Sequence, residues 1–232
     1  MGNKINPVAF RTGVVKNWQT RWFFTDQAGA SAGLRRNYRR FLEEDELIRK
    51  VIRNKISQAG IAGIEIERTS ANLRVLIRAA RPGFVIGRGG KGIEELTRDL
   101  ENSVRKLRGP SGGKLRLSLN VEELKRSEVS AAYVAQLIAW DMERRIPFRQ
   151  TLRKQIEQLS QNREIKGARI LVSGRLDGNE ISRREWKATG SLPLQMIRAD
   201  IDYGTASAHC SYGTVGVKVW VYRGEIFNKP SK

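Results

Sequence analysis

The sequence has one cysteine and one histidine, the neighbours Cys210 and His209, in 232 residues. A single cysteine excludes an internal disulfide framework, and one histidine with one cysteine cannot complete a tetrahedral zinc shell. Neighbours on a strand point to opposite faces, so they do not form a nucleophile and its base. Asp200 and Asp202 could share a strand face, but a surface carboxylate pair beside Arg198 explains them without a catalytic role. We therefore expect no enzyme, no metal and no cofactor.

Long apolar runs are also missing. The longest strongly apolar run without charge, residues 129–140, is well short of the ~20 residues that a bilayer requires. Residues 1–6 are basic and lack the apolar core of a signal peptide. We expect a protein of the cytoplasm, with no membrane contact and no small-molecule substrate.

Acidic residues are scarce relative to basic ones. There are 24 Asp and Glu against 43 Lys and Arg, which gives a net charge of +19, and 40% of the residues are hydrophobic. That composition can fill a core, so the charge belongs to a folded protein rather than to a disordered tail. The excess favours a polyanionic partner, such as nucleic acid or an anionic membrane surface, over an acidic protein.

Hydrophobic periodicity predicts an α+β first half. Apolar residues recur at helical spacing over 41–59, alternation of period two follows over 64–67 and 72–77, and a second helical stripe covers 93–107. Alternation over 115–121 after the Gly- and Pro-rich residues 109–113 predicts another strand of the same sheet. A strand, a helical crossover and a strand form a parallel pair.

The second half predicts another α+β unit. A helix is expected over 127–146, with Val129, Tyr133, Leu137 and Trp140 on one face. A second helix is expected from Phe148 to about 159, with Leu152, Ile156 and Leu159 buried, and Pro147 breaks between the two. Runs typical of strands follow at 168–173, 180–187, 197–203 and 215–222.

The most informative local pattern lies at residues 85–93, Val-Ile-Gly-Arg-Gly-Gly-Lys-Gly-Ile. Its glycines match the dinucleotide fingerprint G-x-G-x-x-G, but Pro82 and Gly83 interrupt the strand and no acidic residue lies between Glu101 and Glu122. The pattern also fits V-I-G-x-x-G-x-x-I of K-homology (KH) modules, in which a tight glycine turn between two helices lies against a phosphodiester backbone. A glycine-rich junction without ligand is the third interpretation. The RNA-binding loop expected from the KH interpretation consists of Ile86, Gly87, Arg88, Gly89, Gly90 and Lys91.

The order helix-strand-strand-helix-helix-strand around this loop is that of a type II KH domain with a mixed three-stranded sheet. We expect a second α+β domain after it, with two helices packed on a mainly antiparallel sheet. The predicted division is an N-terminal segment at 1–37 packed on the first domain, the KH domain at 38–122, the C-terminal domain at 123–225 and a short tail at 226–232.

Basic residues form a second constellation. Each of these residues alone fits an ordinary solvent-exposed position, and Arg153, for example, could simply pair with Glu157. Together they favour a surface that neutralises phosphates. One helix end and the helix after it carry Arg144, Arg145, Arg149, Arg153 and Lys154. Further candidates for RNA contact are Lys4, Arg11, Lys16, Arg35, Arg36, Arg39, Arg40, Arg183, Arg184 and Lys187.

Long ordered blocks at 172–181, 190–194, 198–203 and 212–220, and the opening residues 1–7 with Trp18 and Trp22, resemble the bacterial family of small-subunit ribosomal protein three. The resemblance implies a place in the head of the small ribosomal subunit, contact with its ribosomal RNA and with neighbouring head proteins, and no catalytic centre.

The resemblance also implies that Arg144, Arg145, Arg149, Arg153 and Lys154 face incoming mRNA at its entrance and help to open its secondary structure. Gln150 stands where a second arginine is frequent, and a longer basic tail of many members is not expected here. A free KH-type RNA or DNA chaperone or repair factor is the alternative function, and a nucleotide-dependent enzyme is a more distant one.

Overall fold

A computed structural model describes residues 4–22, 31–69, 72–108, 116–124 and 129–227, without the side chains of 31–37. The chain divides into two compact units, Gln19–Leu124 and, together, Met1–Trp18 with Lys125–Lys232. The prediction that the whole segment 1–37 packs on the first domain was therefore wrong for its first eighteen residues. None of the helices in these described ranges combines the length and apolar character needed to cross a membrane.

The first unit has the predicted order of elements. Two short 3₁₀ turns, Ser57–Ala59 and Arg88–Gly90, follow α2 and α3. Its elements are β1 (Thr20–Arg21), α2 (Ser31–Lys55), β2 (Ile61–Arg68), β3 (Asn72–Ala79), α3 (Pro82–Ile86), α4 (Lys91–Arg108) and β4 (Arg116–Glu123).

The sheet of this unit is mixed, as expected, and has the order β1-β2-β3-β4. Strands β2 and β3 are antiparallel, whereas β3 and β4 are parallel, because α3 and α4 carry the chain back between them. The two-residue strand β1 adds a fourth strand that period-two patterning is too short to detect. The Gly- and Pro-rich residues 109–113 lie outside the described residues.

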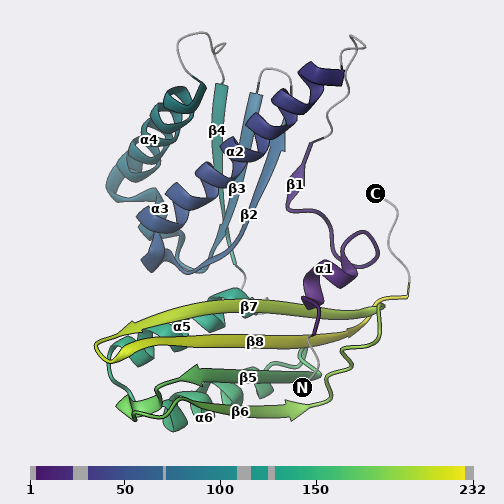
Figure 1. The fold of residues 1–232 in the computed structure, drawn as a ribbon, viewed down its shortest axis with the longest axis vertical. Coiled ribbons are helices and arrows are strands. Elements are labelled where there is room, and N and C mark those ends of the chain that lie inside the picture. The colour runs from purple at the N-terminus through teal and green to yellow at the C-terminus, as the bar shows by residue number, and fades with distance from the viewer. Residues whose placement is uncertain (1–3, 23–30, 70–71, 109–115, 125–128, 228–232) are drawn as a thin grey trace. The chain divides into compact units, whose positions relative to one another are not determined.

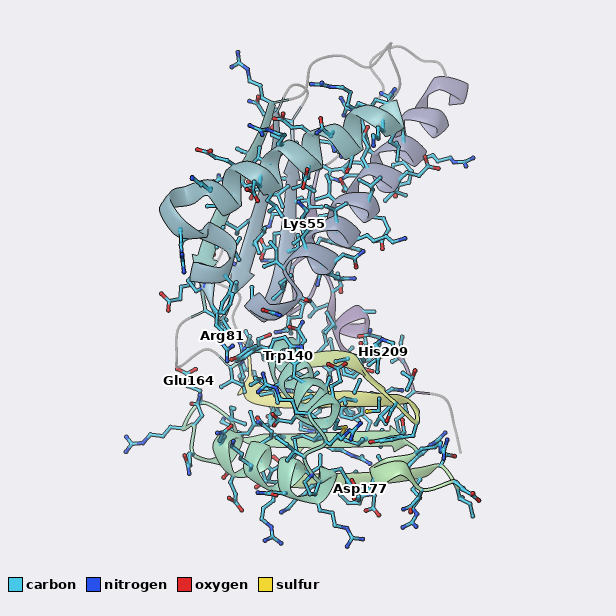
Figure 2. All side chains as sticks on the ribbon, turned by 90° about the vertical axis from the view of Figure 1, so that its left-hand side faces the viewer. Lys55, Arg81, Trp140, Glu164, Asp177 and His209 are labelled. Atoms are coloured by element: carbon cyan, nitrogen blue, oxygen red, sulfur yellow. The ribbon has the colours of Figure 1, made fainter. Side chains whose placement is uncertain are left out.

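Helices α2 and α4 cover one face of this sheet (Figure 1). Ile48 and Ile52 of α2 and Leu100 of α4 pack in one core with Ile66 and Val75 of the strands. An ion pair between Lys55 and Asp99 ties the end of α2 to α4, and Figure 2 labels Lys55 there. Helix α2 begins ten residues before the predicted start at 41, since small residues at 31–33 give no apolar stripe.

The second unit is also α+β. A 3₁₀ turn, Leu176–Gly178, separates its first two strands, and its sheet has the order β6-β5-β8-β7 with antiparallel neighbours throughout. Its elements are α1 (Pro7–Arg11), α5 (Ala131–Glu143), α6 (Phe148–Ser160), β5 (Gly167–Gly174), β6 (Arg183–Gly190), β7 (Ala199–Cys210) and β8 (Gly213–Glu225). These strands confirm the predicted fold class.

Helices α5 and α6 cover one face of this sheet (Figure 1). The α6 residues predicted to be buried, Leu152, Ile156 and Leu159, lie in the core with Ile170 and Val219 of the strands. The terminal residues 228–232 of the predicted tail lie outside the described residues.

The apolar face predicted for α5 is not the side that packs on the sheet. Tyr133 and Trp140 are only partly buried, whereas Ala135 and Ile138 are buried against the sheet. Small residues are needed because α5 approaches the sheet closely: a β-carbon on Gly204 of β7 would lie 2.4 Å from backbone atoms of Ala131. The helix is apolar on several sides, so periodicity alone did not identify the packed side.

Candidate nucleic-acid interface

The glycine loop joins α3 to α4 in a turn that is closed by contact between backbones. Gly87 has φ +69°, and a β-carbon on Gly92 in the first turn of α4 would lie 2.7 Å from the carbonyl oxygen of Val85. Val85 is buried, which fixes α3 against the core below the loop. Gly87 and Gly92 therefore set the angle between the helices, and the sequence interpretation missed this role of Gly92.

The rest of the loop is open to solvent. Gly89 and Gly90 have φ +64° and +81°, and no atom lies within 4 Å of a β-carbon built on either. Arg88 and Lys91 are exposed on both sides of them, beside the exposed Ile86. The first turn of the 18-residue α4 begins at the same point, where the helix dipole favours an anion. These groups suit a phosphate.

A buried ionic cluster ties α2 to the end of β2 and to the C-terminal end of α4, the end of α4 that is remote from the loop. Glu44 accepts hydrogen bonds from Arg68 of β2 at 2.5 Å and from Arg108 at the end of α4 at 2.7 Å, and Asp45 accepts from Arg68 at 2.7 Å. Trp22 Nε1 donates to the other oxygen of Asp45 at 2.8 Å. Burial alone would raise the pKa of Glu44, but the hydrogen bonds and charges of Arg108 and Arg68 outweigh it and lower the pKa.

Two of the predicted basic residues after α5 lie in the turn that follows it, and three lie on the solvent side of α6. We call Arg144, Arg145, Arg149, Arg153 and Lys154 the α5–α6 basic face; all five are exposed.

The turn between the two helices shapes this face. Arg145 adopts φ +63°, a left-handed conformation that is rare for a side chain of its size, and Pro147 then begins α6. Across the described part of the chain, no carboxylate lies within ion-pair distance of any of the five cations, so Arg153 does not pair with Glu157. Their charges remain available to a polyanion.

The structure removes Arg11 from the candidates for RNA contact. Its side chain is fully buried, and its guanidinium donates to the carbonyl oxygens of Pro7, Leu194 and Met196 at 3.0, 2.9 and 2.7 Å. Desolvation lowers the pKa of Arg11, against the opposing charge of Asp200. Arg11 instead attaches the N-terminal helix α1 to the segment before β7.

Lys16 is also engaged within the protein, through an ion pair of 2.5 Å with Asp200. The cation that pairs with Asp200 is thus Lys16, whereas Arg198, the neighbour expected from the sequence, pairs with Glu225 at 2.9 Å. Asp202 accepts a hydrogen bond at 2.8 Å from the backbone of Ala131, at the start of α5. Both aspartates have structural partners.

The remaining candidates are dispersed. Lys4 is exposed, Arg39 pairs with Glu43 at 2.8 Å, and Arg40 approaches the buried Glu44 at 3.9 Å. Arg35 and Arg36 lie in α2, and their side chains are outside the described residues. On β6, Arg184 lies on the face opposite to the helices, whereas Arg183 and Lys187 alternate with it and lie on the other face.

The interpretation of His209 and Cys210 agrees with the structure. They are successive residues of β7, with His209 exposed and Cys210 packed against the helix-side core. The described residues contain no group of three or more His, Cys, Asp and Glu side chains placed to hold a metal ion.

Comparison with protein families matches residues 47–129 to the KH domain and residues 138–221 to the family described as ribosomal protein S3, C-terminal domain. The chain is 43% identical to small ribosomal subunit protein uS3 of Desulforamulus reducens over 100% of this chain and 96% of the relative. It is 42% identical to that of Caldicellulosiruptor saccharolyticus, over 97% and 94%, and to that of Maridesulfovibrio salexigens, over 98% of each chain.

The fold and the glycine loop define a KH-domain protein of the RNA-binding class, with a second α+β domain after the KH domain. The match continues through that second domain and over 94–98% of the length of these relatives. The chain belongs to the ribosomal protein S3 family, which is structural and not enzymatic.

Proposed function

We propose that the chain is a structural component of the head of the small ribosomal subunit, that it binds ribosomal RNA, and that its α5–α6 basic face contributes to the positioning and unwinding of mRNA at the entrance. Its partners are then small-subunit ribosomal RNA, mRNA and neighbouring head proteins, on ribosomes in the cytoplasm. The names of the relatives support assembly into the small subunit.

The observation that carries the mRNA proposal is the unpaired charge of the α5–α6 basic face. The opposite side of α6 is anchored in the core by Leu152 and Ile156, so Arg149 and Arg153, one helical turn apart, are presented from a rigid element. Guanidinium groups bind phosphates in a fixed fork geometry and do not depend on base identity. Such a row can hold one strand of an mRNA while the paired strand separates.

The KH loop supports the RNA-binding part of the proposal. Gly89 and Gly90 leave the turn free of side chains, so a phosphodiester can approach the backbone N–H groups at the start of α4. Arg88 and Lys91 supply counter-charge at the same turn. The loop holds a backbone and leaves sequence discrimination to other contacts.

The test is the double variant Arg149→Gln and Arg153→Gln, assayed in purified small subunits. We expect normal assembly on density gradients but slower translation through an mRNA hairpin, with little change on an unstructured message. The matched control is Arg74→Gln with Arg78→Gln, which removes the same charge from a face where both arginines have glutamate partners. Equal translation through the hairpin by the double variant and the native chain would refute the mRNA role.

The alternative function, a free KH-type RNA or DNA chaperone or repair factor, predicts activity that survives removal of ribosomes. Fractionation at physiological salt separates the two functions. The proposal places the chain with small subunits, and the alternative places it in the free fraction.

A further inference from the structure

The second sheet has one face that α5 and α6 do not cover, and it faces the viewer in Figure 1. The strand registers place Trp186 of β6, Leu171 of β5, Lys218 of β8 and Thr205 of β7 in one row across this face. The next row holds Ala188, Arg169, Trp220 and Tyr203, and the row on the other side holds Arg184, Ser173, Gly216 and Ser207. We call these three rows the outer face.

Aromatic rings and one guanidinium form the centre of the outer face. The Arg169 guanidinium carbon lies 4.7 Å from the ring centre of Trp186 and 5.9 Å from that of Trp220. Tyr203 continues the series, with its ring centre 5.3 Å from that of Trp220. Trp186 is nevertheless 58% exposed, although a tryptophan of this size usually loses most of its surface on folding. One large flat ring is therefore held in position and left uncovered.

The charge of the outer face has one sign. Arg169, Arg184 and Lys218 are its charged residues, no carboxylate occurs in the three rows, and none of these cations has an ion-pair partner in the described part of the chain. The remaining residues are mostly small or hydroxylic. The face thus combines positive charge and exposed aromatic surface, and few large side chains project from it.

The exposed face of the KH-unit sheet shows that this charge pattern is not a general property of the chain. There Glu65 pairs with Arg21 and Arg78 at 3.0 and 3.3 Å, and Glu67 approaches Arg21 and Arg74 at 3.7 Å. Arg78 also pairs with Glu122. Arg21, Arg74 and Arg78 of that sheet are thus paired with carboxylates of the protein, whereas the cations on the outer face of the second sheet have no carboxylate partner among the described residues. The difference points to a polyanionic occupant for the second sheet.

We propose that the outer face binds a short single-stranded RNA segment, with a base stacked on Trp186 and with phosphates contacted by Arg184 and Lys218. Base stacking on an aromatic ring is sequence-tolerant, and cations beside it neutralise the backbone. Arg169, held between Trp186 and Trp220, positions the Trp186 ring. This extends the proposed RNA binding to another surface, and it does not depend on the mRNA role of the α5–α6 basic face.

The available length limits the site to few nucleotides. One end of the outer face is closed by a small core in which Ile201 and Tyr222 pack with Leu194 and Met196. Three rows on four strands remain, and a four-stranded sheet of this width accommodates about two or three stacked bases. The occupant is therefore a loop or an unpaired junction rather than a duplex, whose bases are not exposed for stacking.

The first experiment locates the occupant in the particle. Trp186→p-benzoylphenylalanine is incorporated in the full chain, small subunits are isolated, and crosslinks are mapped after irradiation. We expect crosslinks to nucleotides of an unpaired RNA segment. Crosslinks that reach only a neighbouring protein, or none above the level of the unirradiated sample, would overturn the proposal. In either case the mRNA role of the α5–α6 basic face is still tested separately by its own double variant.

The second experiment measures the contribution of each group with the full chain and a labelled uridine octanucleotide. Arg88→Asp with Gly89→Asp forms the background, so that the KH loop does not dominate binding. In that background, Trp186→Ala is expected to weaken binding roughly 5- to 50-fold, while Trp186→Phe retains most of it. Retention by the phenylalanine variant shows that the sheet remains folded. Equal affinity of the alanine variant and the background would contradict stacking.

The cations are tested by the salt dependence of the same binding. Arg184→Gln with Lys218→Gln is expected to reduce the slope of log affinity against log salt by about 1.4, since each phosphate contact on a single strand contributes about 0.7. Arg74→Gln with Arg78→Gln is the matched control and should leave the slope unchanged. An unchanged slope in the first pair would exclude phosphate contact at the outer face.

Discussion

The backbones of Gly87 and Gly92 meet across the KH turn so closely that a β-carbon on Gly87 would lie 2.9 Å from the amide nitrogen of Gly92. This contact brings the end of α3 against the first turn of α4. It explains why glycine is needed at two positions where a β-carbon would meet backbone, while Gly89 and Gly90 have open space and only a positive φ. The loop is thus built from two kinds of glycine with separate roles.

The first prediction follows from that separation. Gly92→Ala should lower the free energy of unfolding of the KH unit by about 1–3 kcal/mol, because backbone must move to admit the methyl group, and should weaken RNA binding with it. Gly83→Ala in α3 is the matched control, since nothing lies within 4 Å of its β-carbon and alanine favours a helix. Urea denaturation measures the free energy of unfolding of both variants. Equal values would contradict the prediction, because they would show that the turn admits the methyl group without strain.

The second prediction concerns pH. The pKa of Glu44 is lower in the folded state than the ~4.3 of a free glutamate, so its contribution to stability is fully present above that value and is lost as pH falls through the folded pKa. Glu44→Gln should therefore cost about 3 kcal/mol at pH 7 and much less near pH 3.

Hydrogen exchange of α2 peptides at the two pH values measures this difference locally. Glu43→Gln is the control, because Glu43 is exposed and its pair with Arg39 is solvated. If Glu44→Gln lowers the free energy of unfolding by the same amount at pH 7 and at pH 3, the cluster does not favour the charged form of Glu44.

The third prediction separates structural from RNA-binding arginines. Arg11→Met should destabilise the second unit by about 2–4 kcal/mol, because the carbonyl oxygens of Pro7, Leu194 and Met196 lose a charged donor in a buried site. It should leave the salt slope of RNA binding unchanged in the fraction that remains folded. A slope reduced as strongly as by Arg149→Gln would mean that Arg11 reaches phosphate after all.

The fourth prediction tests the packing of α5. Gly204→Ala should cost about 1–3 kcal/mol, since its methyl group would lie 2.4 Å from backbone atoms of Ala131. Gly216→Ala, on the other face of the same sheet, has as its nearest neighbour the Ser173 hydroxyl at 3.4 Å and should be nearly neutral. Thermal denaturation compares the melting temperatures of the two variants. Similar values would show that α5 can move away from β7 without a loss of stability.

Strong periodicity explains what could be predicted from the sequence. The stripe of Leu152, Ile156 and Leu159 fits only one packed side of α6, and Leu73, Val75 and Ile77 fit only one side of β3, so both predictions are confirmed. The glycine loop was recognised because its nine residues occur in the element order that a KH domain requires.

Other features depend on tertiary context that the sequence does not express locally. In α5 the buried residues include three alanines, which add little to an apolar stripe, and the larger Tyr133 and Trp140 misled the periodicity argument. Strand β7 extends seven residues beyond the predicted end at 203 because its small polar residues pair with the long β8. Arg11 has the same chemistry as any surface arginine, and only burial reveals its role.

The outer face was also missed at the sequence level. None of Trp186, Trp220, Arg169 and Lys218 was among the candidates for RNA contact. The available signal was alternation, since Lys218 and Trp220 share a strand face. Only the strand registers show which residues lie beside them on the neighbouring strands, and that none of these is a carboxylate.

The central claim is that surplus cationic side chains on two folded units hold RNA within the small subunit. The most direct measurement is ultraviolet crosslinking of intact small subunits that contain the full chain, followed by identification of every crosslinked peptide and nucleotide. The account predicts crosslinks to RNA from both units, including peptides with the KH loop and with α6. A chain that crosslinks only to proteins in the intact particle, or that is absent from small subunits at physiological salt, would contradict it.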